Sequence, residues 1–515
     1  MKRISLINIF ILFNSIICLS QAYDANWLIG NGGGTGYNNC IVHFDSTSST
    51  SIAVNANIPL VQTNACISDS IGNLLFITNG INLYDSTFNQ IAGGQLVQNQ
   101  YTAQYIQTGL NQPQQAIFIP YPGDTNKFVL FYTTKEYLMP TGAGGWVPFP
   151  LPTHLYYTVL DKSLNGGLGG VLSANNIAIS DTLSQSGSGL AVVKHANGRD
   201  YWIIVKKHYK NIYHKFLLTP SGLNYEGNQA IGPNNQFFLG APSIFSPDGT
   251  IYGQSRGNYD IFLFHFDRCT GNFTDYLHLL ALDPSGLYGC EQIVFSANSR
   301  YLYASTGYFI SQFDLLNYNT SGAVQNSAMI VAYSDSDTTA CAPLNFPVYY
   351  SSAARLALNN KIYISSTHSC DRLSTIEFPD SAGWTSNVVT GNFPIASPNA
   401  GSVPYFTNYK LGPLVGSGCD TLTVGIQEPI KQVSLSLNLY PNPATTEVKV
   451  EINSGNIYKK RVIKIETPDG RLILAKTSEN GSILIDVSNF SNGLYFLTVS
   501  DKTTIKSIKF IVVHE

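Results

Sequence analysis

The residues that could do chemistry in this chain are scattered, and they match none of the common catalytic patterns. The sequence has no His-Glu-x-x-His zinc motif, no Gly-x-Ser-x-Gly nucleophile elbow and no glycine-rich phosphate loop ending in Lys-Ser/Thr. Asp69, Asp248, Asp267 and Asp314 stand where strands are expected to end, so we interpret them as turn residues. Carboxylates that converge from distant segments cannot be recognised from spacing. The sequence therefore assigns no catalytic residue, no metal ligand and no cofactor.

Two histidines share one sequence context. His43 and His265 are each followed by Phe-Asp, as a structural repeat would place them. We expect each to make a strand-end hydrogen bond to Asp, and a metal or catalytic role is the alternative. The glycine-rich stretch at residues 30–36 lacks a lysine and precedes no helical pattern, so it is interpreted as a loop.

Two features could bind a ligand. Lys206, Lys207, Tyr209 and Lys210 form a basic and aromatic cluster between two strand-like runs, which predicts a hairpin tip. A solvated tip and a contact with an acidic glycan are the two interpretations. Trp146 lies in an irregular glycine-rich segment and is a candidate for stacking on a sugar.

The elements that must position these residues form a repeat. An apolar strand, a turn with Asp, Asn or Gly, a second aromatic strand and a third strand often ending in Phe-Asp or Tyr-Asp recur in seven units. The units cover residues 26–46, 66–86, 116–161, 189–218, 242–267, 291–314 and 354–378. Their spacing is typical of propeller blades, each a small sheet that buries its faces against its neighbours.

The turn at residues 245–252, Phe-Ser-Pro-Asp-Gly-Thr-Ile-Tyr, is the sharpest copy, and residues 295–303 repeat its frame. Pro and Gly supply the backbone angles of a tight turn there, and Asp can bond the following backbone. These copies resemble the Ser-Pro-Asp-Gly repeats of WD-repeat-like propellers from bacterial surface and periplasmic proteins. The resemblance implies a seven-bladed β-propeller; an array of β-sandwiches is the alternative.

The N-terminus has the order of a secretory signal peptide. Met1-Lys2-Arg3 precede an apolar run that ends in Ser-Gln-Ala, which predicts cleavage after Ala22. A lipoprotein signal at Cys18 is the alternative, although Ile17 stands where a small residue is expected. We expect no transmembrane segment after the signal. Loss of Cys18 leaves an odd number of cysteines, and separations such as Cys269 to Cys290 suit disulfides between neighbouring strands or loops.

Charge excludes one class of partner. The chain carries 29 Lys and Arg against 32 Asp and Glu, a net charge of −3. Nucleic acid binding needs a basic face that neutralises phosphates. We therefore expect no nucleic acid partner.

The C-terminal residues carry the most specific motifs. Tyr440-Pro441-Asn442-Pro443 open this region, five runs of alternating apolar residues follow, and Asp469-Gly470 form a hairpin turn. Gly493 and Tyr495 begin a later strand within Asn-Gly-Leu-Tyr, and a strand containing Lys506 to Lys509 comes last. The alternation predicts a small β-sandwich.

These ordered motifs resemble the type A sorting domain of the type IX secretion system in Bacteroidetes-type bacteria. The resemblance implies recognition by that secretion machinery, export across the outer membrane, and removal of the domain with release or surface attachment. An ordinary immunoglobulin-like binding module is the alternative.

The sequence thus predicts an all-β chain with a signal peptide (1–22), a propeller-like domain (23–411), a linker (412–436) and a sorting domain (437–515). The favoured function is an exported surface or extracellular protein that binds a glycan or protein ligand. A secreted propeller glycoside hydrolase or polysaccharide lyase and a structural surface-layer component are the alternatives.

Overall fold

The structure is a computed structural model, and the chain divides after Thr421 into two compact units. It describes residues 21–31, 39–137, 150–184, 189–234, 242–255, 258–287, 289–334, 341, 348–350, 352–366, 369–399, 401–420, 436–453, 461–478, 481–500 and 505–514. The signal peptide therefore lies, apart from its last two residues, outside the described residues. No helix in these ranges is long and apolar enough to cross a membrane.

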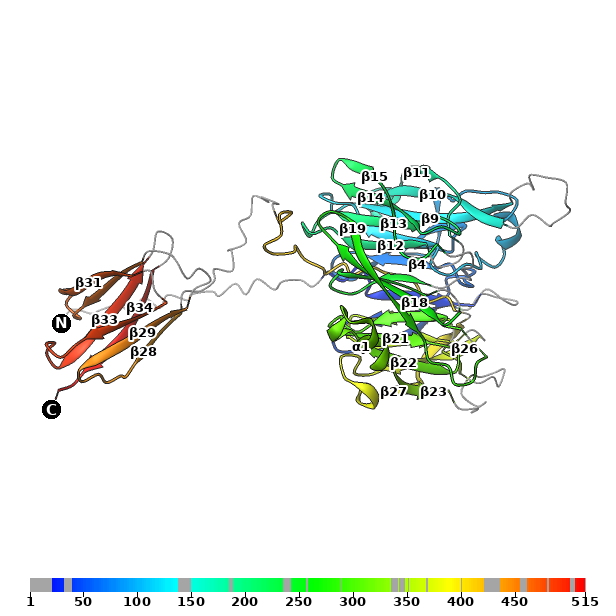
Figure 1. Ribbon diagram of the computed structural model, residues 1–515. Helices are drawn as coiled ribbons and strands as arrows, with labels where there is room; N and C mark the ends of the chain where they lie inside the picture. Colours follow the sequence, from blue (N-terminus) through cyan, green and yellow to red (C-terminus); the bar gives the residue numbers. More distant parts are fainter. Residues whose placement is uncertain are drawn as a thin grey trace, which may run out of the picture. The chain divides into compact units, whose positions relative to one another are not determined.

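The first unit is a seven-bladed β-propeller. Within the ranges above it contains seven antiparallel sheets, six with four strands and one with three (Figure 1). Within each of these sheets every strand pairs with the next along the chain, so each blade is a meander, and in the four-stranded blades the first strand is the inner one. The seven repeat units of the sequence coincide with the seven sheets, which confirms the predicted fold class.

The strands of the blades, in chain order, have the following bounds: β1 (Asn26–Gly30), β2 (Asn39–Phe44), β3 (Ser49–Val54); β4 (Ala65–Ser68), β5 (Leu74–Thr78), β6 (Asn82–Asp85), β7 (Gln90–Gln95); β8 (Ala116–Pro120), β9 (Lys127–Tyr137), β10 (Pro150–Asp161), β11 (Gly170–Ser180); β12 (Leu190–Lys194), β13 (Tyr201–Lys206), β14 (Ile212–Thr219), β15 (Gly222–Ala230); β16 (Ser243–Phe245), β17 (Ile251–Ser255), β18 (Asp260–Asp267), β19 (Asn272–Leu280); β20 (Gln292–Phe295), β21 (Tyr301–Ser305), β22 (Phe309–Asp314), β23 (Met329–Tyr333); β24 (Ala353–Leu356), β25 (Ile362–Ser365), β26 (Cys370–Ile376), β27 (Val388–Asn399). One short helix, α1 (Ser321–Asn326), connects β22 to β23.

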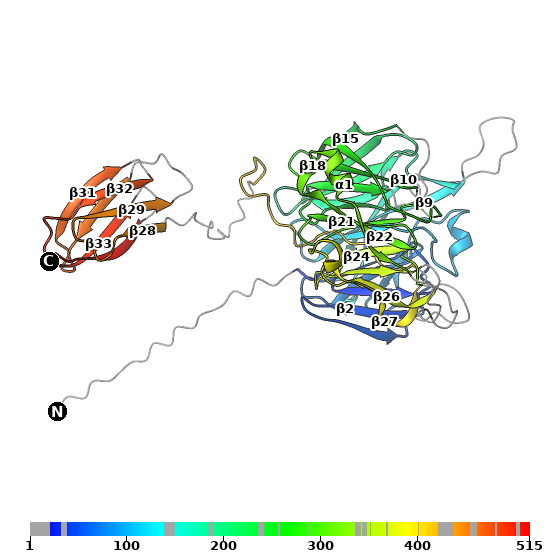
Figure 2. The same ribbon diagram turned by 60° about the horizontal axis from the view of Figure 1, so that its bottom comes forward.

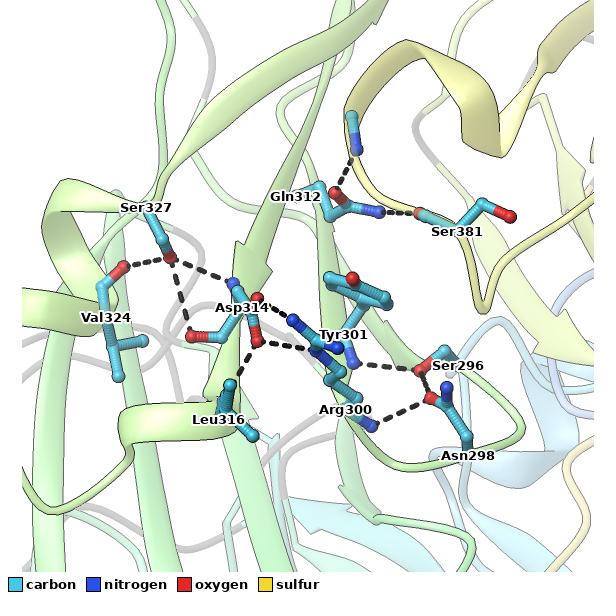
Figure 3. Close-up of polar contacts among 11 residues, drawn as sticks. Ser296, Asn298, Arg300, Tyr301, Gln312, Asp314, Leu316, Val324, Ser327 and Ser381 are labelled. Atoms are coloured by element: carbon cyan, nitrogen blue, oxygen red, sulfur yellow. Dashed lines mark hydrogen bonds and ion pairs between the residues drawn. The ribbon is translucent and has the colours of Figure 1, made fainter.

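A repeated hydrogen-bond pattern shapes the turn after the first strand. The Ser246 hydroxyl donates to Asp248 and accepts from the backbone N–H of Ile251. In the next blade Ser296 does the same with Asn298 and Tyr301 (Figure 3). The side chain therefore takes over hydrogen bonds that a tight turn leaves open, and the turn interpretation of Asp248 is confirmed.

The third strand of several blades ends in an aspartate that caps the following turn. Asp267 accepts from the backbone N–H of Cys269 at 2.8 Å. Asp314 accepts from Leu316 N–H and forms a two-pronged ion pair with Arg300, which Figure 3 shows across β21 and β22. The predicted strand-end role of these carboxylates is confirmed.

The first blade differs from the others because it closes the ring. Asn26 lies against Ser68 and Leu28 against Asn64, so β1 runs opposite to β4, the first strand of the next blade. Strands β1–β3 therefore match the second to fourth strands elsewhere. The first and last blades meet where β2 and β3 pack on β27 (Figure 2).

The C-terminal unit is a small β-sandwich. One sheet has the order β28-β29-β32 and the other the order β31-β30-β33-β34. The strands are β28 (Ser436–Tyr440), β29 (Glu447–Asn453), β30 (Arg461–Glu466), β31 (Leu472–Ser478), β32 (Ser482–Asp486), β33 (Gly493–Ser500) and β34 (Ile505–Val512). Alternate residues such as Ile463, Ile465, Leu497 and Val499 are buried between the sheets. The predicted sandwich is confirmed.

Candidate functional site

The segment that follows the last blade runs through the centre of the ring. The Ser402 side chain bonds both backbone groups of Gly30 at the end of β1. Further along, Thr407 donates to the carbonyl of Val192 in β12 at 2.7 Å, and Tyr409 donates to that of Phe118 in β8 at 2.6 Å. Residues 401–412 thus contact strands of three blades from within the channel.

This segment leaves the channel beside blades four and five. Arg268 donates to the Gly412 carbonyl at 2.7 Å, and the Leu414 N–H donates to Ala196 at 2.7 Å. A disulfide between Cys269 and Cys419 then fixes the chain to the turn after β18. The first part of the expected linker, residues 412–419, is therefore bonded to the propeller.

A cavity of about 230 Å³ remains in the channel beside this segment. It lies at the end of the ring where the Ser-Pro-Asp-Gly turn and its copies stand, because Pro247 and Ala297 from these turns line it. Most of its walls are aliphatic and aromatic residues from the first strands of blades four to seven, and the central segment forms the remaining side. The cavity is thus built by parts of the chain that are far apart in sequence.

An aspartate, an arginine and a lysine line this cavity, and they come from distant parts of the sequence. Arg355 of β24 is 8% exposed, and burial lowers the pKa of its guanidinium to about 10. Asp24 precedes β1, and burial raises the pKa of its carboxyl to about 6. Lys410, which is exposed, lines the cavity as well. The site therefore offers one carboxyl group and two basic side chains to a small molecule.

The other carboxyl group with a raised pKa stands at the far end of the channel. Burial raises the pKa of Glu291 to about 7, and Glu291 directly precedes β20. The turns that follow β16 and β20 meet through a bond from Asp248 N–H to Ser299, so these strands share one direction. Asp24 and Glu291 thus lie at opposite ends and do not form an acid and base pair. Across the described ranges, no three His, Cys, Asp or Glu side chains group as metal ligands.

The basic cluster proposed from the sequence forms the predicted hairpin turn between β13 and β14, but its lysines differ. Lys206 is buried at 2% exposure, and Lys207 forms an ion pair with Asp181 at 2.8 Å. Tyr209 and Lys210 are exposed. The turn lies at the end of the ring away from the cavity, because it follows a second strand. Only part of the cluster is therefore accessible to a ligand.

The tryptophans do not form one platform among the described residues. Trp27 and Trp202 are buried in the core, whereas Trp384 is 61% exposed in the connection before β27. Trp146 lies outside the described residues, so its stacking role stays a prediction.

His43 and His265, which share one sequence context, bond to residues other than the aspartates that follow them in the sequence. His43 Nδ1 lies 2.9 Å from Asn26 Oδ1. His265 Nδ1 lies 3.0 Å from Asp275 and its ring packs on Tyr318. The expected bond to an aspartate is therefore wrong for His43, whereas His265 bonds an aspartate of the neighbouring strand β19.

The suggested pairing of Cys269 with Cys290 is wrong. Cys269 pairs with Cys419, Cys341 pairs with Cys370, and Cys290 is buried and unpaired. Cys269 stands in a turn after a third strand, whereas Cys290 precedes a first strand, so they lie at opposite ends of the ring.

In the C-terminal unit, the motif residues hold the last strand in place. The Asn442 side chain accepts from Ile511 N–H at 2.9 Å, and the Asn492 side chain bonds the backbone of His514. Tyr495 is buried, stacks on Phe510 and donates its hydroxyl to Ser491. The motifs are thus parts of one β-sandwich edge.

Other motif residues shape the entry and the hairpin of the same sandwich. Tyr440 bonds Glu451, the Tyr440-Pro441 and Asn442-Pro443 peptides are cis, and Ala444 pairs with β34. Asp469 accepts from the Thr467 hydroxyl, and Gly470 has a φ of +86° in the turn between β30 and β31. The hairpin turn predicted at Asp469 and Gly470 is therefore present, and Tyr440 to Pro443 open the sandwich as the sequence predicts.

Comparison with known families decides the nature of this unit, because residues 438–514 match the family described as the secretion system C-terminal sorting domain. The C-terminal unit is a type IX sorting domain. The chain is therefore cargo of the type IX secretion system, which exports it to the cell surface or the medium with removal of the sorting domain. The sorting domain implies that the chain interacts with the type IX secretion machinery.

No curated protein matches the chain. Among solved structures, a functionally unknown protein from Desulfotomaculum acetoxidans is 14% identical, covers 70% of this chain and 94% of its own, and has a TM-score of 0.36. A Lactobacillus plantarum protein is 11% identical over 74% and 99% of the two chains, with a TM-score of 0.38. PorZ of Porphyromonas gingivalis, a surface component of the type IX secretion system, is 13% identical over 93% and 69%, with a TM-score of 0.28. Likenesses at these values assign no ligand or activity.

Sequence reasoning missed the central segment, Asp24 and Arg355. The available signal was the aromatic run Tyr405-Phe406-Thr407-Asn408-Tyr409, which follows the last repeat unit and belongs to no blade. Such a run next to a linker is a candidate for burial against the body.

Proposed function

We propose that this cargo is a binding protein, and that its propeller takes a small ligand into the cavity beside the central segment. The cavity carries the proposal: it is lined by a buried arginine and a partly buried acid on apolar walls. Binding sites have this composition, with a few polar groups on a largely apolar surface.

The arrangement of carboxyl groups favours binding over hydrolysis. Hydrolysis of a polysaccharide by two carboxyl groups requires that these groups lie within about 10 Å of each other. Asp24 and Glu291 stand at opposite ends of a channel that Tyr405 and Tyr409 fill. A ligand in the cavity would therefore meet one carboxyl group and not two.

Native mass spectrometry of the mature protein from the medium tests this proposal. The protein is titrated with a panel of glycans, amino acids and short peptides, and the Ala297→Trp variant is run beside it because Ala297 lines the cavity mouth. The control is Ile71→Trp, a 63% exposed turn position in the second blade that does not line the cavity. We expect a ligand that the wild type and control retain and Ala297→Trp loses.

Two results would contradict the proposal. Equal retention by Ala297→Trp would place binding outside the cavity. Cleavage of a bound glycan in the same sample would make the propeller an enzyme.

A further inference from the structure

The polar groups of the cavity have an arrangement that selects among small ligands. Its volume of about 230 Å³ lies below the range of roughly 300–1,000 Å³ that holds drug-sized ligands. Its walls include Val192, Ile244, Val294, Phe295 and Ala354, which offer only carbon surface. An occupant must therefore be small, with an apolar part beside its polar groups.

Arg355 is fixed in place but keeps free donors. Its Nε donates to the Pro404 carbonyl at 3.3 Å and its Nη1 to the Ala354 carbonyl at 2.8 Å. The ring of Tyr405 lies 5.2 Å from the guanidinium carbon. Within the described part of the chain no atom accepts from Nη2, and a guanidinium has five N–H donors. The side chain is thus positioned to donate to a carboxylate.

Asp24, in contrast to Arg355, has an acceptor atom to which no described residue donates. Its Oδ1 is buried and has no hydrogen-bond partner among the described residues. Lys410 is a cation near this carboxyl group, and its charge partly offsets the rise in the Asp24 pKa that burial causes. An acceptor buried without a donor costs free energy, and more so when it is ionised. Asp24 also lines the cavity, so a cationic group of a ligand beside its carboxyl group would offset that cost.

We propose that the cavity binds a small zwitterion, an amino acid or a dipeptide, with its ammonium group at Asp24, its carboxylate at Arg355 and its side chain on the apolar walls. This inference rests on the proposed binding function. A simple anion would leave Asp24 without a donor, and a neutral sugar would neutralise neither group. A zwitterion satisfies both, which is why the structure favours it.

Isothermal titration calorimetry on the mature protein at pH 7.5 tests the assignment with L-leucine and glycyl-L-leucine as probes. N-acetyl-L-leucine lacks the ammonium group and L-leucinamide lacks the carboxylate. We expect one of the zwitterions to bind at least tenfold more tightly than either derivative. Asp24→Asn should abolish the preference over N-acetyl-L-leucine, and Arg355→Lys should reduce the preference over L-leucinamide. Circular dichroism of each variant controls for folding.

The failures of the two proposals are distinguishable. If N-acetyl-L-leucine binds as tightly as the zwitterions and Ala297→Trp abolishes its binding, the cavity is a binding site but the zwitterion assignment is wrong. If no probe binds at millimolar concentration, the assignment is also wrong. If in addition the wider panel yields no ligand lost by Ala297→Trp, the binding function fails with it.

Discussion

Replacing Cys419 by Ser should destabilise the propeller more than removing the other disulfide does. The Cys269–Cys419 bond spans a sequence separation of 150 residues, and the Cys341–Cys370 bond spans 29. A disulfide restricts the unfolded chain, and the restriction grows with the logarithm of the loop length. The chain-entropy relation gives up to ~5 kcal/mol for the long loop and ~3.5 kcal/mol for the short one.

The measurement is guanidinium chloride unfolding of the mature protein, followed by tryptophan fluorescence and circular dichroism. Cys419→Ser and Cys341→Ser are compared with the wild type with and without reductant. We expect the midpoint to fall in both variants and further in Cys419→Ser, and reductant should lower the wild type below either variant. An equal or smaller loss in Cys419→Ser would refute the reasoning, because the loss of stability would then not increase with the length of the loop that the disulfide closes in the unfolded chain.

Four further outcomes are expected. Burial raises the pKa of Asp24 to about 6 in the folded protein, so ionisation of this carboxyl group disfavours folding. The free energy of unfolding of the wild type, relative to that of Asp24→Asn, should therefore fall by up to ~3 kcal/mol as the pH rises from 4 to 7. Urea unfolding measures this difference, and parallel pH profiles of the two proteins would contradict it. Tyr409→Phe leaves a buried carbonyl of β8 without its donor and should cost ~1–3 kcal/mol in the same assay. Lys206→Ser should destabilise the fold because that side chain is buried, whereas the exposed Lys210→Ser should stay within ~0.5 kcal/mol; equal midpoints would refute the difference. Deletion of residues 437–515 should leave the protein inside the cell, as measured by proteomics of medium and surface fractions, and unchanged export would overturn the sorting role.

The sequence pattern did not predict the outer strand of the four-stranded blades. The predicted units contain the first three strands of these blades but omit the outer strands β7, β11, β15, β19, β23 and β27. Most residues of these strands are exposed or half-buried, as in β19, where Phe273, Leu277 and Leu279 are the buried residues. Because an outer strand is the edge of its sheet and buries few residues, alternating burial constrains its sequence less than that of the inner strands.

The sequence by itself determined the blades, their turns and the sorting domain, because these depend on neighbouring residues. Ser246 and Asp248 shape a turn within five residues, and Asn442 and Tyr495 belong to motifs in fixed order. Local hydrogen bonds and alternating burial leave a signal in the order of residues.

Only the tertiary structure decided which residues meet in the channel. Asp24, Arg355 and Lys410 come from the beginning, the last blade and the segment after it, and they line one cavity because the ring closes. Cys269 finds Cys419 for the same reason. Ring closure depends on how seven sheets pack face to face, and no local pattern specifies which distant side chains that packing brings together.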